Sequence, residues 1–305
     1  MMNNKGQHIL NSVSDFHSLM NVKKPTHPLI SVVRLEDVSR DASRDLETIM
    51  FNFHTIFLKR NFDGKVKYGQ QYYDFDNGTM SFYAPKQLIS LEGDQPGKVE
   101  GWMLAIHPDF LHGYPLAKKV KEYGFFDYAT HEALHLSEAE DEIISGLMQN
   151  LQQEIVERID SHTQDVLIGH VDLLLSYCNR FYGRQFITRK KVSSDLLVKF
   201  ETLLKAYFKE DKAETAGLPT VQYFADHLFV SPNYLNDMLK NLTGQTTQQH
   251  LHNYLIEQAK ELLATTNLSV NEIAYQLGFE FPQSFSKLFK KKTLLTPLQF
   301  KQSYN

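Results

Sequence analysis

Two kinds of hydrophobic pattern divide the chain. From Pro28 to about residue 108, short runs rich in β-branched and aromatic residues alternate with turn residues, which is typical of antiparallel strands. Asp63-Gly64 and Asn77-Gly78 favour positive φ and therefore predict hairpin turns between such strands. From Leu136 onward, apolar residues recur every three or four positions, which is the helical period. The pattern predicts an α+β chain with strands first and helices afterwards.

The predicted strands are short and closely spaced, so we expect them to close into a small antiparallel barrel or a jelly roll. This β domain is assigned residues 28–135, behind a flexible lead-in at residues 1–27 that shows little periodicity. Four aromatic residues are candidates for its interior: Phe53, Tyr73, Tyr83 and Trp102. They either fill the core or line a pocket for a small molecule.

Two helices are predicted after the β domain. Ser137 and Glu140 form a capping box, and an apolar stripe follows them. A second stripe ends near Gly183, and the short connection between the stripes predicts an antiparallel helical hairpin over residues 136–183. Residues 184–194 are polar and basic, as expected of a linker. The apolar surface of the hairpin either covers the β domain or meets a second copy of the chain.

The C-terminal region contains one layout twice. In residues 269–293, a capping box at Ser269 begins a short helix, Gly278 ends it, and a second helix follows Pro282 with Phe281 and Leu288 on its inner face. Residues 220–243 repeat this layout, and the matched buried positions are Val221 with Val270, Ala225 with Ala274, Leu228 with Leu277, Leu235 with Phe285 and Leu239 with Phe289. A small alanine at the crossing lets the two helices approach closely. Each stretch therefore predicts a helix-turn-helix.

The second helix of each unit has a polar outer face. Its residues are long or flexible enough to reach a base edge or a phosphate. They are Gln283, Ser286, Lys287, Lys290 and Lys291 in the downstream unit, and Asn233, Asn236, Asp237 and Lys240 in the upstream unit. The same faces also suit solvated surface helices, or a helical repeat that binds another protein. A repeat that keeps both the buried face and the polar outer face favours DNA recognition.

A helix predicted over residues 246–266 connects the two units. At 1.5 Å per residue it spans roughly 25–30 Å, close to the ~34 Å of one DNA turn, so the outer faces are expected to enter two successive major grooves. Residues 193–305 contain 11 Lys, no Arg and 11 acidic residues, a net charge of 0. We therefore expect modest nonspecific DNA affinity, a shallow salt dependence, and anchoring mainly by the lysines of the downstream unit.

Residues 195–305 resemble the DNA-binding domain of the AraC/XylS family of bacterial transcriptional regulators. The residues that carry the resemblance are EIAYQLGF (272–279), FSKLFKK (285–291), Thr296-Pro297, AKELL (259–263) and SPNYLNDMLKNLTG (231–244). The resemblance covers about a third of the chain. Three positions depart from the usual family pattern: Leu255 replaces an arginine, Asp237 a basic residue, and Leu294 a glycine.

The resemblance implies a DNA-binding domain with two helix-turn-helix units, at about 220–243 and 269–293. It also implies that residues 28–135 form a cupin-like, effector-binding domain and that residues 136–183 serve as a dimerisation hairpin. The expected partners are double-stranded DNA, a small-molecule effector, a second copy of the chain and RNA polymerase. A homodimer is favoured further because linked DNA readers gain affinity. The effector-binding residues, the operator and the sign of regulation stay open.

Catalysis and cofactor binding have no visible site in the sequence. His54 and His107 stand alone in separate predicted strands, without the His-x-His pair and acidic partner of metal-dependent cupins. No GxSxG, Walker or HExxH motif is present, and Cys178 is the single cysteine, which excludes an intrachain disulfide and a cysteine-cluster metal site. The chain has no run of 18 apolar residues and no signal-peptide pattern, so a cytoplasmic protein without enzymatic activity is expected. The alternatives are a barrel enzyme fused to a DNA reader and an adaptor that binds only proteins.

Overall fold

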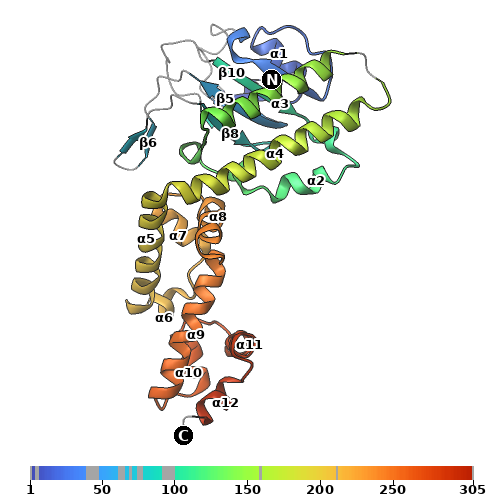
Figure 1. Cartoon of the computed structure of the whole chain (residues 1–305). Coiled ribbons are helices and arrows are strands. Elements are labelled where there is room, and N and C mark those ends of the chain that lie inside the picture. Colours follow the sequence, from blue (N-terminus) through green and yellow to red (C-terminus); the bar gives the residue numbers. More distant parts are fainter. Residues whose placement is uncertain are drawn as a thin grey trace. The chain divides into compact units, whose positions relative to one another are not determined.

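In the computed structural model of the chain, the described residues are 2–3, 7–38, 48–60, 66–68, 71–73, 78–90, 100–157, 160–210 and 212–303. The chain divides into two compact units, Met1–Gln185 and Phe186–Asn305. Within the described residues, the first unit contains strands together with helices, and the second unit contains helices (Figure 1). The chain is therefore an α+β protein with N-terminal sheets and a helical C-terminal region, which confirms the predicted order.

The larger sheet of the first unit has five antiparallel strands in the order β11-β8-β5-β10-β3. These strands are β3 (Ile30–Arg34), β5 (His54–Arg60), β8 (Thr79–Tyr83), β10 (Glu100–Ile106) and β11 (Leu134–His135). Strand β5 is paired on both sides, so that Ile56 lies between Phe82 and Leu104. Side chains alternate between the two faces of a sheet, so Leu104 and Met103 point to opposite faces.

A second sheet has four short strands in the order β1-β2-β4-β9, and β6 and β7 form a separate two-stranded ribbon. The strands are β1 (Met2–Asn3), β2 (Gln7–Leu10), β4 (Thr48–Phe51), β6 (Val66–Tyr68), β7 (Gln71–Tyr73) and β9 (Leu88–Ser90). Strand β2 pairs with β4 in parallel. No strand pairing joins the two larger sheets among the described residues, so the predicted closed barrel is not observed in this part of the chain.

The two predicted hairpin turns fall largely outside the described residues. Asp63, Gly64 and Asn77 lie outside them, so the turn at Asp63-Gly64 stays a prediction. Gly78 is described and has φ +98°, which matches the positive φ expected at that position.

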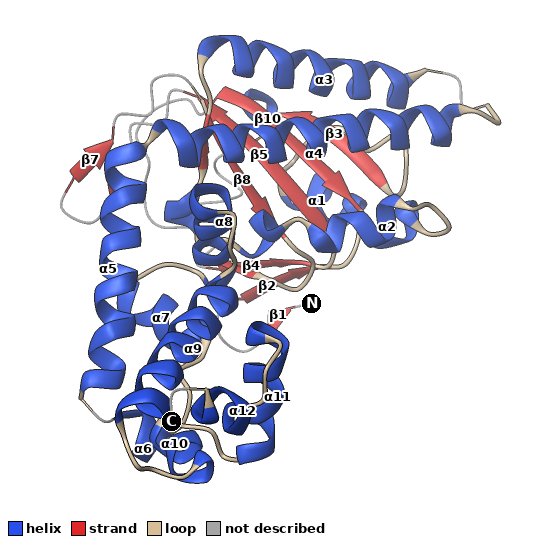
Figure 2. Ribbon diagram, turned by 60° about the horizontal axis from the view of Figure 1, so that its bottom comes forward, coloured by secondary structure: helices blue, strands red, loops and turns tan. Residues whose placement is uncertain are grey.

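Hydrophobic residues are buried on both faces of the five-stranded sheet. On one face, Val33 and Met103 pack with Phe16 of α1 (Val13–Leu19) and Phe51 of the smaller sheet. On the other face, helices α3 (Glu138–Val156) and α4 (Thr163–Thr188) run across the strands (Figure 2). Leu104 is fully buried on that face. Removal of this apolar surface from water on both sides is the main force that holds the first unit together.

The four aromatic residues predicted for the interior of the β domain do not all lie on the same face of the sheet. Phe53, Tyr83 and Trp102 are buried, but the strand register places Trp102 on the helical face and Tyr83 on the opposite face. The ring of Trp102 lies beneath the guanidinium of Arg34, 3.8 Å from its centroid. The side chain of Tyr73 lies outside the described residues. A one-residue change of register moves a side chain to the other face, and the sequence alone does not fix that register.

The helices of the first unit follow the predicted pattern, with one difference in length. Ser137 and Glu140 cap α3 reciprocally, as predicted. A further short helix, α2, spans Leu116–Lys119. Helix α4 continues to Thr188, five residues beyond the predicted end at Gly183. Helix α5 (Lys190–Lys209) then follows, so helix occupies most of the range predicted as a linker.

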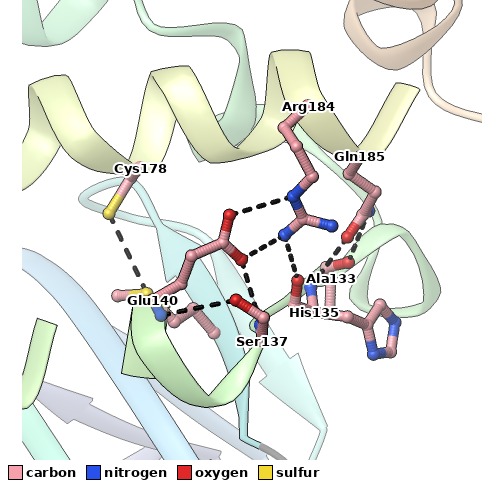
Figure 3. A network of polar contacts seen from close by, with 8 residues as sticks. Ala133, His135, Ser137, Glu140, Cys178, Arg184 and Gln185 are labelled. Carbon is pink, nitrogen blue, oxygen red and sulfur yellow. Dashed lines mark hydrogen bonds and ion pairs between the residues drawn. The ribbon is translucent and has the colours of Figure 1, made fainter. Parts of the chain in front are cut away.

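Polar contacts near the end of α4 explain why the helix does not stop at Gly183 (Figure 3). The guanidinium of Arg184 donates to both carboxylate oxygens of Glu140, at 3.0 Å from Nε to Oε1, and to the carbonyl of His135 at 2.8 Å. The side chain of Gln185 accepts from the N–H of His135 at 2.8 Å and donates to the carbonyl of Ala133 at 3.2 Å. A glycine inside a helix costs about 1 kcal/mol, and these contacts offset that cost.

The second unit is a chain of helices that begins within α4 and continues with α5. The further helices are α6 (Lys212–Ala216), α7 (Val221–Leu228), α8 (Pro232–Thr243), α9 (Thr247–Thr265), α10 (Val270–Gln276), α11 (Pro282–Thr293) and α12 (Pro297–Gln302). Its core is rich in aromatic residues, and Phe200 and Phe224 are fully buried with their rings edge to face. This core carries the two repeated helix pairs.

Candidate nucleic-acid interface

Two helix pairs in the second unit have the same backbone construction. We call α7 with α8 the first reader and α10 with α11 the second reader. In each reader the turn passes through one residue with positive φ, Phe229 at +57° and Gly278 at +87°. In each, the N–H that follows returns to the buried alanine of the first helix, from Val230 to Ala225 at 3.1 Å and from Phe279 to Ala274 at 2.9 Å. Both readers are therefore helix-turn-helix units.

Most inner positions that the repeat predicts are buried, whereas Val221, Leu228 and Val270 are half-buried. Ala225 and Ala274 are fully buried where the helices cross, and so are the paired positions of the second helices, Leu235, Leu239, Phe285 and Phe289. One prediction for this face is wrong. Phe281 is 59% exposed, because it is the residue that precedes the first turn of α11 rather than a residue of its inner face. Leu288 is half-buried.

The outer face of the second reader presents polar side chains to solvent. Gln283, Lys287, Lys290 and Lys291 are exposed, and Ser286 is half-buried. Within the described part of the chain, none of these five side chains has a hydrogen bond or an ion pair. Lys292 differs from its neighbours, because its Nζ donates to Oδ1 of Asn253 on α9 at 2.8 Å. The second reader therefore keeps three ammonium groups, one amide and one hydroxyl available on a single helix.

The outer face of the first reader is less positively charged and more engaged in the fold. Asn233 and Lys240 are exposed, whereas Asn236 and Asp237 are half-buried. The amide oxygen of Asn236 accepts from the N–H of Thr247, the first residue of α9, at 3.3 Å. One lysine and one aspartate therefore face outward here, where the second reader has lysines alone.

Helix α9 connects the two readers and contains 19 residues, which correspond to about 28 Å. Thr246 and Gln249 cap its N-terminus reciprocally, as expected from the sequence. Its buried side consists of Leu251, Leu255, Ile256, Ala259 and Leu263. The pKa of His252 on this helix is lowered by burial and, to a smaller extent, by Lys292 and Lys291.

Several polar contacts within the second unit were not found by reasoning from the sequence. Asn253 of α9 forms hydrogen bonds with Gln245 and with Lys292. Lys301 of α12 donates to the carbonyl of Leu268. A sequence signal does exist for a related set of contacts. Thr243 and Thr293, fifty positions apart, both return their hydroxyls to the carbonyl four residues earlier, at 2.8 and 2.9 Å. Each is followed three and six positions later by Thr and Gln. The repeat therefore extends beyond α8 and α11, which we call the recognition helices of the two readers.

His54 and Cys178, which were considered for metal binding, lie in buried surroundings. Burial lowers the pKa of His54 to about 4, with Lys121 as a smaller cause, so its ring is neutral near pH 7. Burial raises the pKa of the Cys178 thiol, whose Sγ lies 3.9 Å from Sδ of Met80. Across the described ranges, His, Cys, Asp and Glu side chains form no group of three that could hold a metal ion. Nor does any helix in those ranges have the length and apolar character needed to cross a membrane.

Comparison with known proteins supports the assignment of the second unit. Residues 224–303 match a family described as a helix-turn-helix domain. An uncharacterized HTH-type transcriptional regulator of Escherichia coli K12, YijO, is 25% identical over 283 residues, which are 84% of this chain and 96% of that protein. The HTH-type transcriptional activator RhaR of Cronobacter sakazakii is 33% identical over 84 residues, which are 28% of this chain and 30% of that protein.

Among solved structures, the C-terminal domain of the two-component response regulator yesN from Fusobacterium nucleatum is 34% identical. The match covers 33% of this chain and 96% of that domain, with a TM-score of 0.30. The relatives of known sequence and the two readers described above together identify the C-terminal domain. Residues 224–303 therefore form a helix-turn-helix domain of the AraC type, and the chain is similar to HTH-type transcriptional regulators.

Proposed function

We propose that the protein is a ligand-responsive regulator that recognises a specific DNA sequence by placing its two readers in two successive major grooves. The observation that carries this proposal is the outer face of the second reader. Its lysines, amide and hydroxyl are held on one helix with no internal partner among the described residues. Base edges and phosphates are the groups that such a set of donors binds.

The readers divide the contacts between them. In the second reader, Gln283 and Ser286 face base edges, while Lys287, Lys290 and Lys291 bind phosphates. In the first reader, Asn233 and Lys240 supply donors, and Asn236 contributes the NH2 group of the amide whose oxygen holds Thr247. Asp237 accepts a hydrogen bond from a cytosine amino group, which is the base contact that suits a carboxylate.

The first unit supplies the response to a ligand and the assembly of the regulator. Residues 28–135 form a cupin-like effector-binding domain behind the lead-in at residues 1–27, and residues 184–194 connect it to the readers. The hairpin at residues 136–183 pairs with its equivalent in a second copy of the chain. Apolar side chains left exposed on α3 and α4 support that role: Ile143, Val156, Val166 and Leu173. A cytoplasmic location and contact with RNA polymerase follow from the same regulatory role.

A binding-site selection with the purified full-length protein tests the proposal first. Enrichment of one sequence with two half-sites about one helical turn apart is the expected outcome. No enrichment of any DNA sequence would favour an adaptor that binds only proteins, a function that the net charge of 0 in residues 193–305 also allows.

The selected DNA then tests the contact assignment. We expect Lys287→Ala with Lys290→Ala to weaken binding in a gel shift at least ~10-fold and to reduce the salt slope by about two units. Lys199→Ala with Lys205→Ala removes the same charge from exposed positions of α5 and serves as the control. Equal affinity of the two double variants, with both folded by circular dichroism, would remove the assigned contacts.

A further inference from the structure

Asn253 on α9 binds both readers. Its Nδ2 donates to Oε1 of Gln245 at 2.8 Å, and Gln245 lies in the connection directly after α8. Its Oδ1 accepts from Nζ of Lys292 at 2.8 Å, and Lys292 lies in the last turn of α11. One half-buried amide therefore joins the C-terminal ends of the two recognition helices.

Helix α12, whose Phe300 packs on Phe289 of the second reader, makes another polar attachment near the far end of α9. Nζ of Lys301, on α12, donates to the carbonyls of Thr266 at 3.2 Å and Leu268 at 2.7 Å, just beyond the last turn of α9. Thr266 lies thirteen positions after Asn253, which corresponds to about 20 Å along a helix. A body attached at one point turns about that point, whereas attachment at two distant points fixes its rotation. Lys292 and Lys301 thus attach the second reader, together with α12, at two separate points: Asn253 within α9 and the residues just beyond its C-terminus.

The first reader is attached to the N-terminal end of the same helix. Asn236 accepts from the N–H of Thr247, and the hydroxyl of Thr243 lies 2.8 Å from Nε2 of His250. The first two turns of α9 therefore hold the first reader firmly. Asn253 lies in the next turn, where the attachments of the two readers meet.

We propose that Asn253 is a positioning residue that fixes the angle between the two recognition helices and so selects the spacing between the two half-sites. This inference rests on the proposed DNA binding by both readers. Apolar packing along α9 is nondirectional and tolerates small rotations of the second reader. Hydrogen bonds are directional, so the two bonds of Asn253 favour one orientation. Asn253 does not touch DNA in this role; it acts through Gln245 and Lys292.

The test uses full-length protein and a set of duplexes built from the selected site. The set contains the optimal spacing, spacings changed by one and two base pairs in each direction, and a duplex with the second half-site alone. For Asn253→Leu we expect unchanged affinity for the single half-site and a loss of about 3- to 10-fold at the optimal spacing, the size of about one net hydrogen bond. Affinity at the altered spacings should change less, so that the spacing preference becomes flatter.

Matched variants separate positioning from loss of charge and from damage to the fold. Lys292→Met and Lys291→Met each remove one positive charge from the same helix end, but only Lys292 binds Asn253. We expect only Lys292→Met to flatten the spacing preference. Asn253→Asp keeps the acceptor for Lys292 and loses the donor to Gln245, and it should restore part of the preference. Gln258→Leu, a half-buried position on the same helix, is the control for substitution on α9.

The outcomes distinguish the two proposals. Wild-type protein that binds no DNA overturns the proposed function and this inference with it. Wild-type protein that binds with a spacing preference which survives in Asn253→Leu and Lys292→Met overturns the positioning role alone. An equal loss on the half-site and on every spaced duplex also overturns it, because a general weakening of the second reader would produce that result.

Discussion

The two readers share a backbone and differ in almost every side chain that touches solvent. In both, a buried alanine marks the helix crossing, and a threonine hydroxyl closes the end of the recognition helix. Helix α8 of the first reader buries leucines and has a single lysine on its outer face, beside an aspartate. Helix α11 of the second reader buries phenylalanines and has lysines alone as charged groups on its outer face. The repeat therefore keeps the residues that shape the backbone, the alanine and the threonine, while the outward residues differ between the two readers.

One pair of equivalent positions shows how the backbone affects the outer face. Asn236 and Ser286 occupy the same position, fifty residues apart. In the first reader the next helix begins with Thr247, whose N–H requires an acceptor and receives it from Asn236. In the second reader the equivalent residue is Pro297, which has no N–H. Ser286 therefore has no N–H of this kind to bind, and its hydroxyl is available to a ligand. The amide oxygen of Asn236 is already occupied by the N–H of Thr247.

Substitution of a buried core residue in either reader is expected to have the largest effect, a loss of free energy of unfolding. Phe289→Ala should lower the free energy of unfolding of the second unit by about 3–5 kcal/mol, and Leu239→Ala by about 2–5 kcal/mol. Phe289 is fully buried and packs its ring against Phe285 and Phe300, with centroids 5.8 and 5.4 Å apart. Urea unfolding followed by far-ultraviolet circular dichroism measures both variants.

The single tryptophan provides an internal control for these core variants. Trp102 lies in the first unit, so its fluorescence reports on that unit alone. Its unfolding transition should be the same in wild type, Phe289→Ala and Leu239→Ala. A shift of the tryptophan transition by either variant would show that the units do not unfold independently, and a loss under 1 kcal/mol for Phe289→Ala would contradict its assignment to the core.

The second effect concerns charge on the outer faces. Asp237→Asn removes a negative charge from the first reader and should raise affinity for unrelated DNA by roughly 5-fold at low salt, the equivalent of ~1 kcal/mol of repulsion. It should weaken binding to the selected site, because the carboxylate that accepts from cytosine is lost. Lys240→Ala should weaken binding and reduce the salt slope by about one unit. Gel shifts at several salt concentrations measure both changes. Stronger binding of Asp237→Asn to the selected site as well as to unrelated DNA would contradict the proposed base contact.

The parts of the fold that depend on neighbouring residues were predictable from the sequence. The caps at Ser137, Thr246 and Ser269 satisfy N–H groups within the same turn, so the residues that make the contact are three positions apart. The end of α4 was not predictable in this way. Gly183 is a poor helix residue, and the contacts that carry the helix past it come from Glu140 and the 133–135 segment, some fifty residues earlier.

The same distinction separates what was and was not predictable in the interface. The outward residues of α8 and α11 follow from helical periodicity once the buried residues are known. The bond between Asn253 and Lys292 joins positions 39 residues apart with partly or fully exposed side chains, and no periodic pattern marks such a pair. Sheet closure and the opposite faces of Trp102 and Tyr83 depend on strand register, which also results from contacts distant in sequence.

The smallest effect is expected where the two recognition helices end. Both end in a left-handed residue at the same position of the repeat, Gly244 with φ +74° and Leu294 with φ +65°. Gly244→Ala should lower the free energy of unfolding by about 1 kcal/mol, the cost of a left-handed conformation for a residue with a Cβ. No atom lies within 4 Å of the added Cβ, so the cost is conformational rather than steric.

Leu294→Gly should have the opposite sign and a smaller size. It relieves a strain of about 1–2 kcal/mol but adds about 0.4–1 kcal/mol of entropy to the unfolded chain, so a gain of roughly 0.5 kcal/mol remains. Leu294 is 83% exposed, so little burial is lost. Leu294→Ala keeps the strain and is the matched control, expected to melt at the wild-type temperature. A lower melting temperature for Leu294→Gly than for Leu294→Ala would mean that the left-handed conformation carries no strain here, and the contrast between the two helix ends would then have to arise from their side chains.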